Sequence, residues 1–244
     1  MADTADIYKQ EAAERAVMAV TDGMVVGLGT GTTADYFLRA LAARVDAGLR
    51  VLGVATSERT EARARQLGIP LTPLDAQPRL AITVDGADEV DLRTFDVIKG
   101  RGGALLREKI VASATDVEVI IVDESKIVPR LGAHGRVPVE VIPFGWHHTA
   151  AYLQALGADV GLRRLPDAPA GPPLPVDPDN AYLTDSGNFI LDCHWPAIAD
   201  AGALAAQIKA IAGVVEHGIF IGLTRRVIVA GAQGVTVYEH PVAG

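Results

Sequence analysis

Short apolar stretches alternate with helical stretches along the first half of the chain, and this alternation limits the folds open to it. Aliphatic, β-branched runs predict strands, and apolar residues at helical spacing predict helices. Alternation of this kind predicts a doubly wound, mostly parallel, Rossmann-like α/β sheet. Strands are expected at 24–27, 50–54, 69–72, 80–84, 97–98 and 118–122, and helices at 6–20, 33–44, 57–68 and 104–114, with Asp3 or Thr4 capping the first helix and Thr56 and Ser57 the third.

The pattern changes after Pro129. A strand, a helix, two strands, a helix and a strand follow, and this βαββαβ order predicts a ferredoxin-like α+β unit. We expect these elements at 137–142, 145–157, 159–164, around a hairpin at 186–188, and at 199–212 and 214–220, with a proline-rich loop at 165–179. Strands at 227–230 and 235–238 return to the first pattern. The sequence therefore predicts a catalytic α/β domain of residues 1–131 and 221–244, interrupted by an inserted domain of residues 132–220.

Composition excludes several classes of function. The 244 residues carry a net charge of −8, which argues against general binding of nucleic acid or anionic membranes because a basic surface is missing. Cys193 is the single cysteine, so no disulfide framework or thiolate metal cluster is expected. The six histidines are scattered, and we expect no metal site. The chain shows no signal peptide or long apolar segment, which predicts a cytoplasmic protein that does not enter the membrane.

Charged residues gather in one stretch, DGADEVDLRTFDVIKGRGGALLREKI. Asp85 ends the expected strand at 80–84, Asp88 follows it closely, and Lys99 follows the expected strand at 97–98. The carboxyl ends of strands in an open α/β sheet form the edge at which ligands bind. Carboxylates, an ammonium group and the N–H groups of a glycine loop should therefore meet there, in a site for a small, polar, anionic molecule.

Glu108 lies on the apolar side of the expected helix at 104–114. Its neighbours one turn away, Ala104, Leu105, Val111 and Ala112, are apolar. A desolvated carboxyl group has a raised pKa, which suits a group that takes up and returns a proton near neutral pH. Two interpretations remain open from this pattern: a catalytic base, or a buried ion-pair partner of a residue such as Lys99.

A second glycine loop, GTGTT at residues 29–33, lies between an expected strand and an expected helix. Glycines let the backbone approach a ligand closely, and a helix amino terminus offers N–H groups to phosphate. A turn followed by a threonine N-cap, without any ligand, would explain the same sequence. The loop is neither a Walker A motif, which needs a Gly-Lys pair, nor a full G-x-G-x-x-G motif, since Ala34 stands at the last position.

Taken together, the motifs resemble the type A ribose-5-phosphate isomerase family. VGLGTGTTA, DGADEVD, IKGRGGALLREKIV, VDESKIV, VPVEVIP, TDSGNFILD and GVVEHGIF occur in the order of the family, from about residue 9 to residue 220. The resemblance implies interconversion of ribose 5-phosphate and ribulose 5-phosphate through an enediol, as in the non-oxidative pentose phosphate pathway, without metal or organic cofactor. It also implies a homodimer or homotetramer, with the inserted domain near the subunit contact.

The resemblance places the catalytic roles on matching positions. Glu108 would be the general base, Asp85 would help to open the furanose ring, Asp88 would hold hydroxyl groups, and Lys99 would stabilise the developing negative oxygen together with the N–H groups of the loop at 100–103. Phosphate would lie on the loop at 32–33 with Lys9 nearby. The expected substrate-binding residues are Thr30, Gly31, Thr32, Thr33, Gly86, Ala87, Gly100, Arg101, Gly102, Lys126 and Lys9.

Two departures from the family pattern stand out. Arg101 replaces a glycine that is common in the lysine loop, and Ser186 replaces a common asparagine. Alternatives from other classes are a sugar-phosphate-sensing or nucleotide-binding module and an acyl-CoA-transferase-like protein of the same broad fold. A sensing module usually carries an attached DNA-binding segment, and this chain shows no basic helix-turn-helix pattern.

Overall fold

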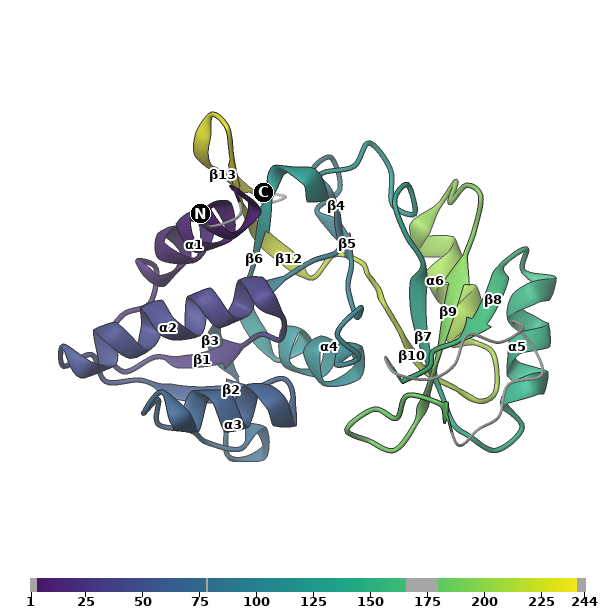
Figure 1. The fold of residues 1–244 in the computed structure, drawn as a ribbon, viewed down its shortest axis with the longest axis horizontal. Helices are drawn as coiled ribbons and strands as arrows, with labels where there is room; N and C mark the ends of the chain where they lie inside the picture. The colour runs from purple at the N-terminus through teal and green to yellow at the C-terminus, as the bar shows by residue number, and fades with distance from the viewer. Residues whose placement is uncertain (1–3, 78, 166–179, 241–244) are drawn as a thin grey trace.

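A computed structural model describes residues 4–77, 79–165 and 180–240. Its first lobe is built on a six-stranded sheet of order β13-β12-β6-β3-β1-β2 (Figure 1). All neighbours in this sheet are parallel except β13, which pairs antiparallel with β12. The prediction of a mostly parallel, doubly wound sheet is confirmed. The strands are β1 (Val25–Leu28), β2 (Leu52–Ala55), β3 (Leu80–Gly86), β6 (Thr115–Asp123), β12 (Thr224–Gly231) and β13 (Gly234–Glu239).

Helices cover both faces of this sheet. Helices α1 (Thr4–Val17) and α2 (Thr32–Asp46) pack on one face, while α4 (Leu105–Ser113) packs against β3 and β6 on the other. Helix α3 (Glu58–Gln66) lies beside the edge strand β2. The inner strands β1, β3, β6 and β12 are mostly buried, which explains why their sequences are near-continuous apolar runs rather than alternating ones.

The order of the strands defines where a ligand can bind. The chain leaves β1 toward β2 on one side and β3 lies on the other side, so the strand order reverses between β1 and β3. In open α/β sheets, ligands bind in the crevice beyond the carboxyl ends of the strands at such a point. The glycine loop at 29–33 follows β1, and Asp85 lies at the end of β3.

A small three-stranded antiparallel sheet, β11-β5-β4, lies between the two lobes (Figure 1). It consists of β4 (Glu89–Asp91), β5 (Asp96–Ile98) and β11 (Ile219–Phe220). The sequence pattern predicts a strand at 97–98 correctly, but the expectation that it joins the main sheet is wrong. Lys99 therefore reaches the site from a separate sheet, because β5 pairs with β4 and β11 instead.

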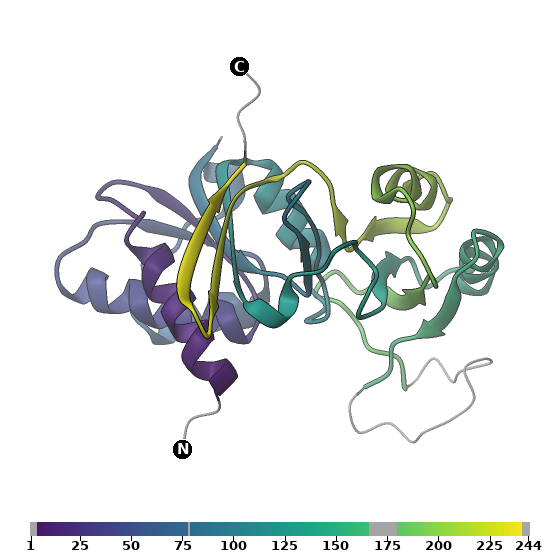
Figure 2. The ribbon, with the colours of Figure 1, turned by 90° about the horizontal axis from the view of Figure 1, so that it is seen from above.

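The inserted unit has the ferredoxin-like order. Its four strands form an antiparallel sheet of order β10-β7-β9-β8, which is the order 4-1-3-2 of a βαββαβ fold. Figure 2 shows this unit beside the first lobe, with α5 on its outer side. The elements are β7 (Val137–Val141), α5 (Trp146–Ala155), β8 (Asp159–Leu162), β9 (Phe189–His194), α6 (Ala201–Lys209) and β10 (Val214–His217). The division at 131/132 and 220/221 stays a proposal, and β11 lies just before its second boundary while pairing with β5.

Five local expectations need correction or fall outside the described residues. The strand expected at 69–72 is only a bridge between Leu71 and Gly53, because the flanking Pro70 and Pro73 have no N–H to donate to a ladder. The expected hairpin at 186–188 is a turn, with Gly187 N–H donating to the Thr184 carbonyl, that leads into the single strand β9.

At the amino terminus, Thr4 lies inside α1 rather than capping it, and Asp3 is outside the described residues. Most of the expected proline-rich loop, residues 166–179, is also outside the described residues. The cap of α3 is Ser57 alone, whose hydroxyl accepts from Thr60 N–H at 3.0 Å. None of the described helices is long and apolar enough to cross a membrane.

Candidate active site

A cavity of about 400 Å³ opens at the carboxyl ends of β1 and β3. Every residue that the sequence analysis assigns to the site lines it, with the exception of Asp85. The lining consists of Lys9, Thr30, Gly31, Thr32, Thr33, Ala34, Arg59, Gly86, Ala87, Asp88, Lys99, Gly100, Arg101, Gly102, Glu108 and Lys126. The three segments around 30–33, 86–88 and 99–102 thus meet, as the sequence predicts.

Lys99 is the buried cation of the site. Its side chain is only 3% exposed, and its Nζ lies 3.0 Å from Asp85 Oδ2 and 3.5 Å from Glu108 Oε2. Nζ also donates to the Gly86 carbonyl. Burial opposes the charge on this amine, but the carboxylates of Asp85 and Glu108 outweigh burial and raise the pKa of Lys99 above its ordinary value. Lys99 therefore remains an ammonium at neutral pH.

Asp85 lies behind Lys99 rather than on the cavity wall. It is 1% exposed, and its Oδ1 accepts from the backbone N–H groups of Thr30 and Gly86 at 3.1 and 2.7 Å. Gly29 makes room for it, since a Cβ at position 29 would lie 2.3 Å from Asp85 Oδ1. Burial raises the pKa of Asp85, and Lys99 opposes the rise. The expected direct role of Asp85 in ring opening is not favoured by this placement, whereas a role in holding Lys99 is.

Glu108 lies in the first turn of α4, where its carboxylate reaches the cavity wall although the side chain is only 3% exposed. Its Oε2 accepts no hydrogen bond from the described residues. Burial raises the pKa of Glu108 to about 8, the nearby Asp85 and Asp88 add to the rise, and Lys99 partly counteracts it. Both interpretations from the sequence stay open, because Glu108 is an ion-pair neighbour of Lys99 and also a buried carboxyl group with a raised pKa.

The loop at 100–103 presents backbone donors. Arg101 N–H donates to Asp88 Oδ2 at 3.1 Å, and Gly103 N–H donates to the Gly100 carbonyl at 3.0 Å. The N–H groups of Gly100 and Gly102 donate to none of the described residues. Gly100 has a φ of 104°, a conformation that favours glycine, and Gly102 lines the cavity. The Gly102 N–H is therefore available to a substrate oxygen.

The loop after β1 offers a place for an anionic group. Helix α2 begins at Thr32 after Gly31, which has a φ of 125°, so the N–H groups of the first helical turn open toward the cavity wall formed by Thr32 and Thr33. Thr30, one of the expected substrate-binding residues, lines the cavity, but its hydroxyl is engaged by the protein. Its Oγ1 is engaged with Thr56, Ser57 and Thr60 hydroxyls at 2.8 to 2.9 Å.

The structure adds residues that the sequence analysis did not single out. Arg59, in the first turns of α3, lines the cavity beside Lys9 and Lys126, and these cations can offset a negative charge there. Position 59 lies two residues after Ser57, an expected cap of the third helix, which is the only sequence signal for it. Among the described residues, no group of three or more His, Cys, Asp or Glu is arranged to hold a metal ion.

Glu118 is a second residue that was missed. It is 2% exposed in β6, directly opposite Thr83 in the register with β3, and its Oε2 accepts no hydrogen bond from the described part of the chain. Burial raises the pKa of Glu118 well above its ordinary value, with Asp85 adding to the rise. The sequence signal was a glutamate inside the apolar run VEVIIV, where a charged residue has no solvent to face.

The fold and the cavity define a class of protein. A buried carboxyl group with a raised pKa, a fixed ammonium and free backbone N–H groups at the switch point of an α/β sheet suit an enzyme that moves a proton on a small anionic substrate. A sequence profile described as ribose 5-phosphate isomerase A (phosphoriboisomerase A) matches residues 52–234, more than half of the chain. The chain belongs to the ribose 5-phosphate isomerase A family.

Individual relatives agree with this assignment. Ribose-5-phosphate isomerase A of Gloeobacter violaceus is 52% identical over 238 residues, which cover 98% of either chain. A D-ribose-5-phosphate isomerase solved in complex with phospho-erythronic acid superposes with a TM-score of 0.89 at 36% identity, over 98% of this chain and all of that one. The ribose 5-phosphate isomerase A of Methanocaldococcus jannaschii superposes with a TM-score of 0.86 at 40% identity, over 95% and 98% of the two chains.

Arg101, where this chain departs from the family pattern, should tolerate replacement by glycine. Among the described non-glycine residues only Phe95 has a positive φ, so position 101 does not require glycine. The Arg101 side chain is half exposed, with Nε 3.8 Å from Asp88 Oδ1. We expect Arg101→Gly to leave KM within about twofold and to lower the free energy of unfolding by about 1 kcal/mol or less.

Steady-state kinetics and urea unfolding measure both quantities, and Arg101→Ala serves as the control for the added backbone freedom of glycine. A tenfold rise in KM would show instead that the guanidinium holds the substrate.

Proposed function

We propose that this chain interconverts ribose 5-phosphate and ribulose 5-phosphate through an enediol, with Glu108 as the general base. The observation that carries the proposal is the pairing, on one cavity wall, of the buried Glu108 carboxyl with the Lys99 ammonium, whose Nζ is 3.5 Å from Glu108 Oε2. Family membership supports the substrate pair, and the geometry supports the roles of the residues.

The reaction moves one proton between neighbouring carbons. Glu108 takes the proton from C2 of the open-chain aldose, negative charge develops on O1, and the proton is then returned to C1 while the O2 proton passes to O1. A base works best when its pKa lies near the operating pH, and the raised pKa of Glu108 meets this condition.

Charge that develops on the enediol oxygens needs fixed donors. The Lys99 ammonium lies on the cavity wall with its side chain only 3% exposed, and Gly102, whose N–H donates to none of the described residues, lines the same cavity. Donors that are fixed before the reaction stabilise such charge most effectively. Asp85 holds Lys99 in place, and Asp88, which lines the cavity, is the carboxylate placed to contact substrate hydroxyls and to assist ring opening.

The phosphate would lie at the other end of the cavity. The N–H groups and hydroxyls of Thr32 and Thr33 at the start of α2 and the side chains of Lys9, Arg59 and Lys126 line this region. The protein as a whole carries a net charge of −8, so its overall charge does not attract an anionic substrate. Such a substrate must therefore be held by local donors of this kind.

The experiment that tests the proposed function is a direct assay of ketopentose formation from ribose 5-phosphate in the presence of a chelator. We expect turnover at the same rate with and without the chelator. A protein that binds ribose 5-phosphate but forms no ribulose 5-phosphate would be a sensing module instead, and the proposal would be wrong.

The pH dependence of the reaction should follow the ionisation of Glu108. Because the base must be deprotonated to accept a proton, kcat/KM should rise with pH and level off above about pH 8, the pKa to which burial raises Glu108. Lys99 remains charged over this pH range, so its titration does not lower kcat/KM at pH values below the ordinary pKa of lysine. A profile that is flat between pH 6 and 9 would contradict this assignment.

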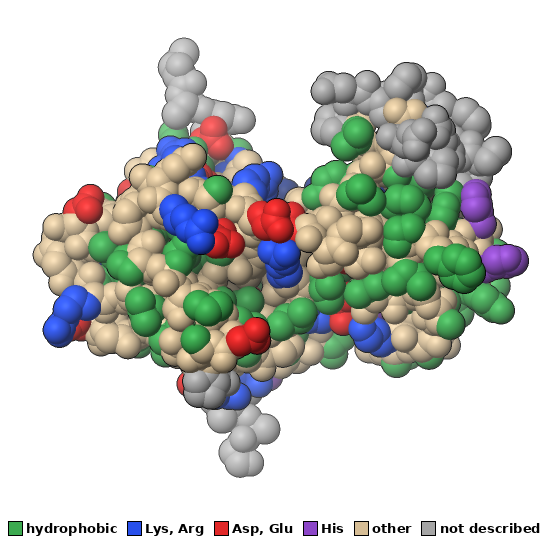
Figure 3. Space-filling model, turned by 90° about the horizontal axis from the view of Figure 1, so that it is seen from below, with side chains coloured by type: hydrophobic (Ala, Val, Ile, Leu, Met, Phe, Trp, Pro, Cys, Tyr) green, Lys and Arg blue, Asp and Glu red, His purple; other side chains and the backbone are tan. Residues whose placement is uncertain are grey.

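We also propose that the protein is a homodimer or homotetramer with the inserted unit near the contact. Apolar side chains gather on the surface of the second lobe (Figure 3). The inserted unit also exposes Phe144, Tyr152 and Ile142, which are 89%, 62% and 41% exposed. Light scattering coupled to size-exclusion chromatography measures the oligomeric state, and Phe144→Glu should weaken it if this surface is used.

A further inference from the structure

Polar side chains of the inserted unit hold the loop at 100–103 from outside the cavity. Arg163 Nη1 donates to the carbonyl oxygens of Gly100 and Arg101 at 3.1 and 3.0 Å, and Tyr182 Oη donates to the Gly102 carbonyl at 3.4 Å. The carbonyl oxygens of three consecutive residues thus bond to the inserted unit, while the Arg101 N–H donates to Asp88 of the first lobe.

Arg163 is itself fixed. Its side chain is 14% exposed, and it forms a two-pronged ion pair with Asp192 in β9, with Nε 2.9 Å from Asp192 Oδ2. The backbone adds to this, because Arg163 N–H donates to the Ile190 carbonyl at 2.8 Å and Tyr182 N–H donates to the Arg163 carbonyl at 2.9 Å. A guanidinium held by a bidentate carboxylate keeps its remaining N–H groups in a fixed direction.

The planarity of the peptide bond transmits this direction to the cavity. In a trans peptide, the carbonyl of one residue and the N–H of the next point in opposite directions. The bond from Arg163 to the Arg101 carbonyl therefore orients the Gly102 N–H, which lines the cavity and has no acceptor among the described residues. The bond to the Gly100 carbonyl orients the Arg101 N–H, which donates to Asp88 Oδ2.

Packing from the same unit leaves the loop no other position. A Cβ at Gly103 would lie 2.2 Å from Tyr182 Oη, and a Cβ at Gly100 would lie 2.9 Å from Pro138 Cγ. Both glycines have positive φ, of 83° and 104°. The inserted unit is thus in close contact with the glycine loop at both ends, and the strand β7, which carries Pro138, belongs to that unit.

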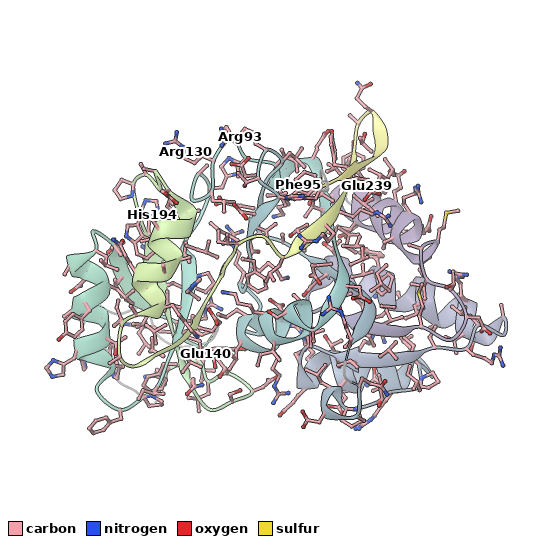
Figure 4. The ribbon with its side chains drawn as sticks, turned by 180° about the vertical axis from the view of Figure 1, so that it is seen from behind. Arg93, Phe95, Arg130, Glu140, His194 and Glu239 are labelled. Carbon is pink, nitrogen blue, oxygen red and sulfur yellow. The ribbon has the colours of Figure 1, made fainter. Side chains whose placement is uncertain are left out.

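Further ion pairs fasten the two lobes near this loop. Arg107 of α4 lies 3.5 Å from Asp185, and the Asp185 carboxylate accepts from Glu58 N–H at 2.8 Å. Figure 3 shows acidic and basic side chains side by side where the lobes meet. Glu140, which accepts from Thr184 and Asn188 at 2.9 Å, lies on the side of the inserted unit that faces α4 (Figure 4). The turn that carries Asp185 is therefore braced from within its own unit.

We propose that Arg163, supported by Asp192 and Tyr182, is a positioning residue that aims the Gly102 N–H at the oxygen on which negative charge develops during isomerisation. The inserted unit thereby takes part in the reaction without touching the substrate. The proposal rests on the proposed enediol mechanism, because an N–H group aimed at a developing charge matters most in the transition state.

The test compares Arg163→Met with a matched control, Arg136→Met. Arg136 directly precedes β7 of the same sheet, bonds to the Asp192 carbonyl and to Asp159, and donates no hydrogen bond to the loop at 100–103. We expect Arg163→Met to lower kcat about ten- to a hundredfold with KM within about threefold, somewhat less than the loss from deleting an oxyanion donor outright. Arg136→Met should keep both constants within about twofold.

A second measurement does not need turnover. Phospho-erythronic acid carries a carboxylate whose two oxygens imitate those of the enediolate, so calorimetry should show that Arg163→Met weakens its binding about as much as kcat/KM falls. Arg163→Lys, which keeps a cation and can reach one carbonyl, should restore part of the loss. Unchanged kcat and unchanged phospho-erythronic acid affinity in Arg163→Met would overturn the proposal, as would an equal loss in Arg136→Met.

Two further results keep the outcome unambiguous. If Arg163→Met fails to fold, Tyr182→Phe offers a milder change, because it removes only one hydroxyl. This variant should lower kcat with little change in KM. An unchanged kcat and an unchanged affinity for phospho-erythronic acid in Tyr182→Phe would overturn the proposal. Failure of the proposed mechanism is recognised separately, because Glu108→Gln would then remain active. An inactive Glu108→Gln together with a fully active Arg163→Met rejects the positioning role alone.

Discussion

Glu108→Gln is expected to fold and bind ribose 5-phosphate, yet to lose about 10²- to 10⁴-fold in kcat, the usual contribution of a general base. The amide keeps the size of the carboxyl group but cannot take up the C2 proton. The Glu108 Oε2 atom accepts no hydrogen bond from the described residues, so its replacement removes only the ion-pair contact with Lys99, whose Nζ lies 3.5 Å away. Steady-state kinetics, with calorimetric binding of ribose 5-phosphate, separates the loss of chemistry from a loss of affinity.

Glu118→Gln is the matched control for this variant. Glu118 is as buried as Glu108 and belongs to the same electrostatic cluster, but it does not line the cavity. Burial raises the pKa of Glu118 well above its ordinary value, and the amide keeps the size of the side chain while removing its titratable group. We expect kcat within about twofold. More than a tenth of wild-type kcat in Glu108→Gln would exclude Glu108 as the base.

Lys99→Met is expected to impair both activity and stability. Loss of the ammonium removes a fixed partner of the developing negative oxygen, for which a fall in kcat of about 10²- to 10³-fold is typical. It also leaves Asp85 and Glu108, which are 1% and 3% exposed, without their buried cation. Removing one member of a buried ion pair costs about 3–5 kcal/mol in the free energy of unfolding.

The loss of stability in Lys99→Met should depend on pH. Without the cation, burial raises the carboxyl pKa values of the folded state further above those of the unfolded chain. The folded state then binds more protons between the two values, so the free energy of unfolding falls as pH rises from about 4 toward 8. Urea unfolding at pH 5 and pH 8 measures this difference, and equal destabilisation at both values would contradict the assignment.

A double variant separates the two effects. Adding Asp85→Asn to Lys99→Met removes one of the unpaired buried charges, so it should recover part of the stability without recovering kcat. If stability recovers and kcat recovers with it, Lys99 acts only through the fold and not on the reaction.

Much of the fold followed from local patterns. The apolar runs that end at Val54, Val84 and Val122 became parallel strands because a strand buried on both faces needs a continuous aliphatic sequence. The βαββαβ order of the inserted unit could be predicted from local patterns too, because the spacing of its apolar residues changes between strands and helices. Asp85, Lys99 and Glu108 were found because charges at strand ends or on an apolar helix side need a partner.

Other features have no local signal. The residues of β4 and β11 are too few to show a period. Strand β4 pairs with β5 across a short connection, whereas β11 pairs with β5 only because the chain returns there more than a hundred residues later. The pattern could not place Asp85 behind Lys99, since the ends of two strands can approach in several ways.

The sequence by itself therefore determined the architecture, the chemical character of the site and the residues that form it, because burial periodicity and unpaired charges are local properties of the chain. Only the tertiary structure determined which donor and acceptor atoms form hydrogen bonds with each other. It brought Arg163 of the inserted unit to the carbonyl side of the loop at 100–103, and Arg59 to the cavity wall. Such contacts join residues far apart in the sequence, and their hydrogen bonds depend on separations of a few tenths of an ångström, which no local pattern encodes.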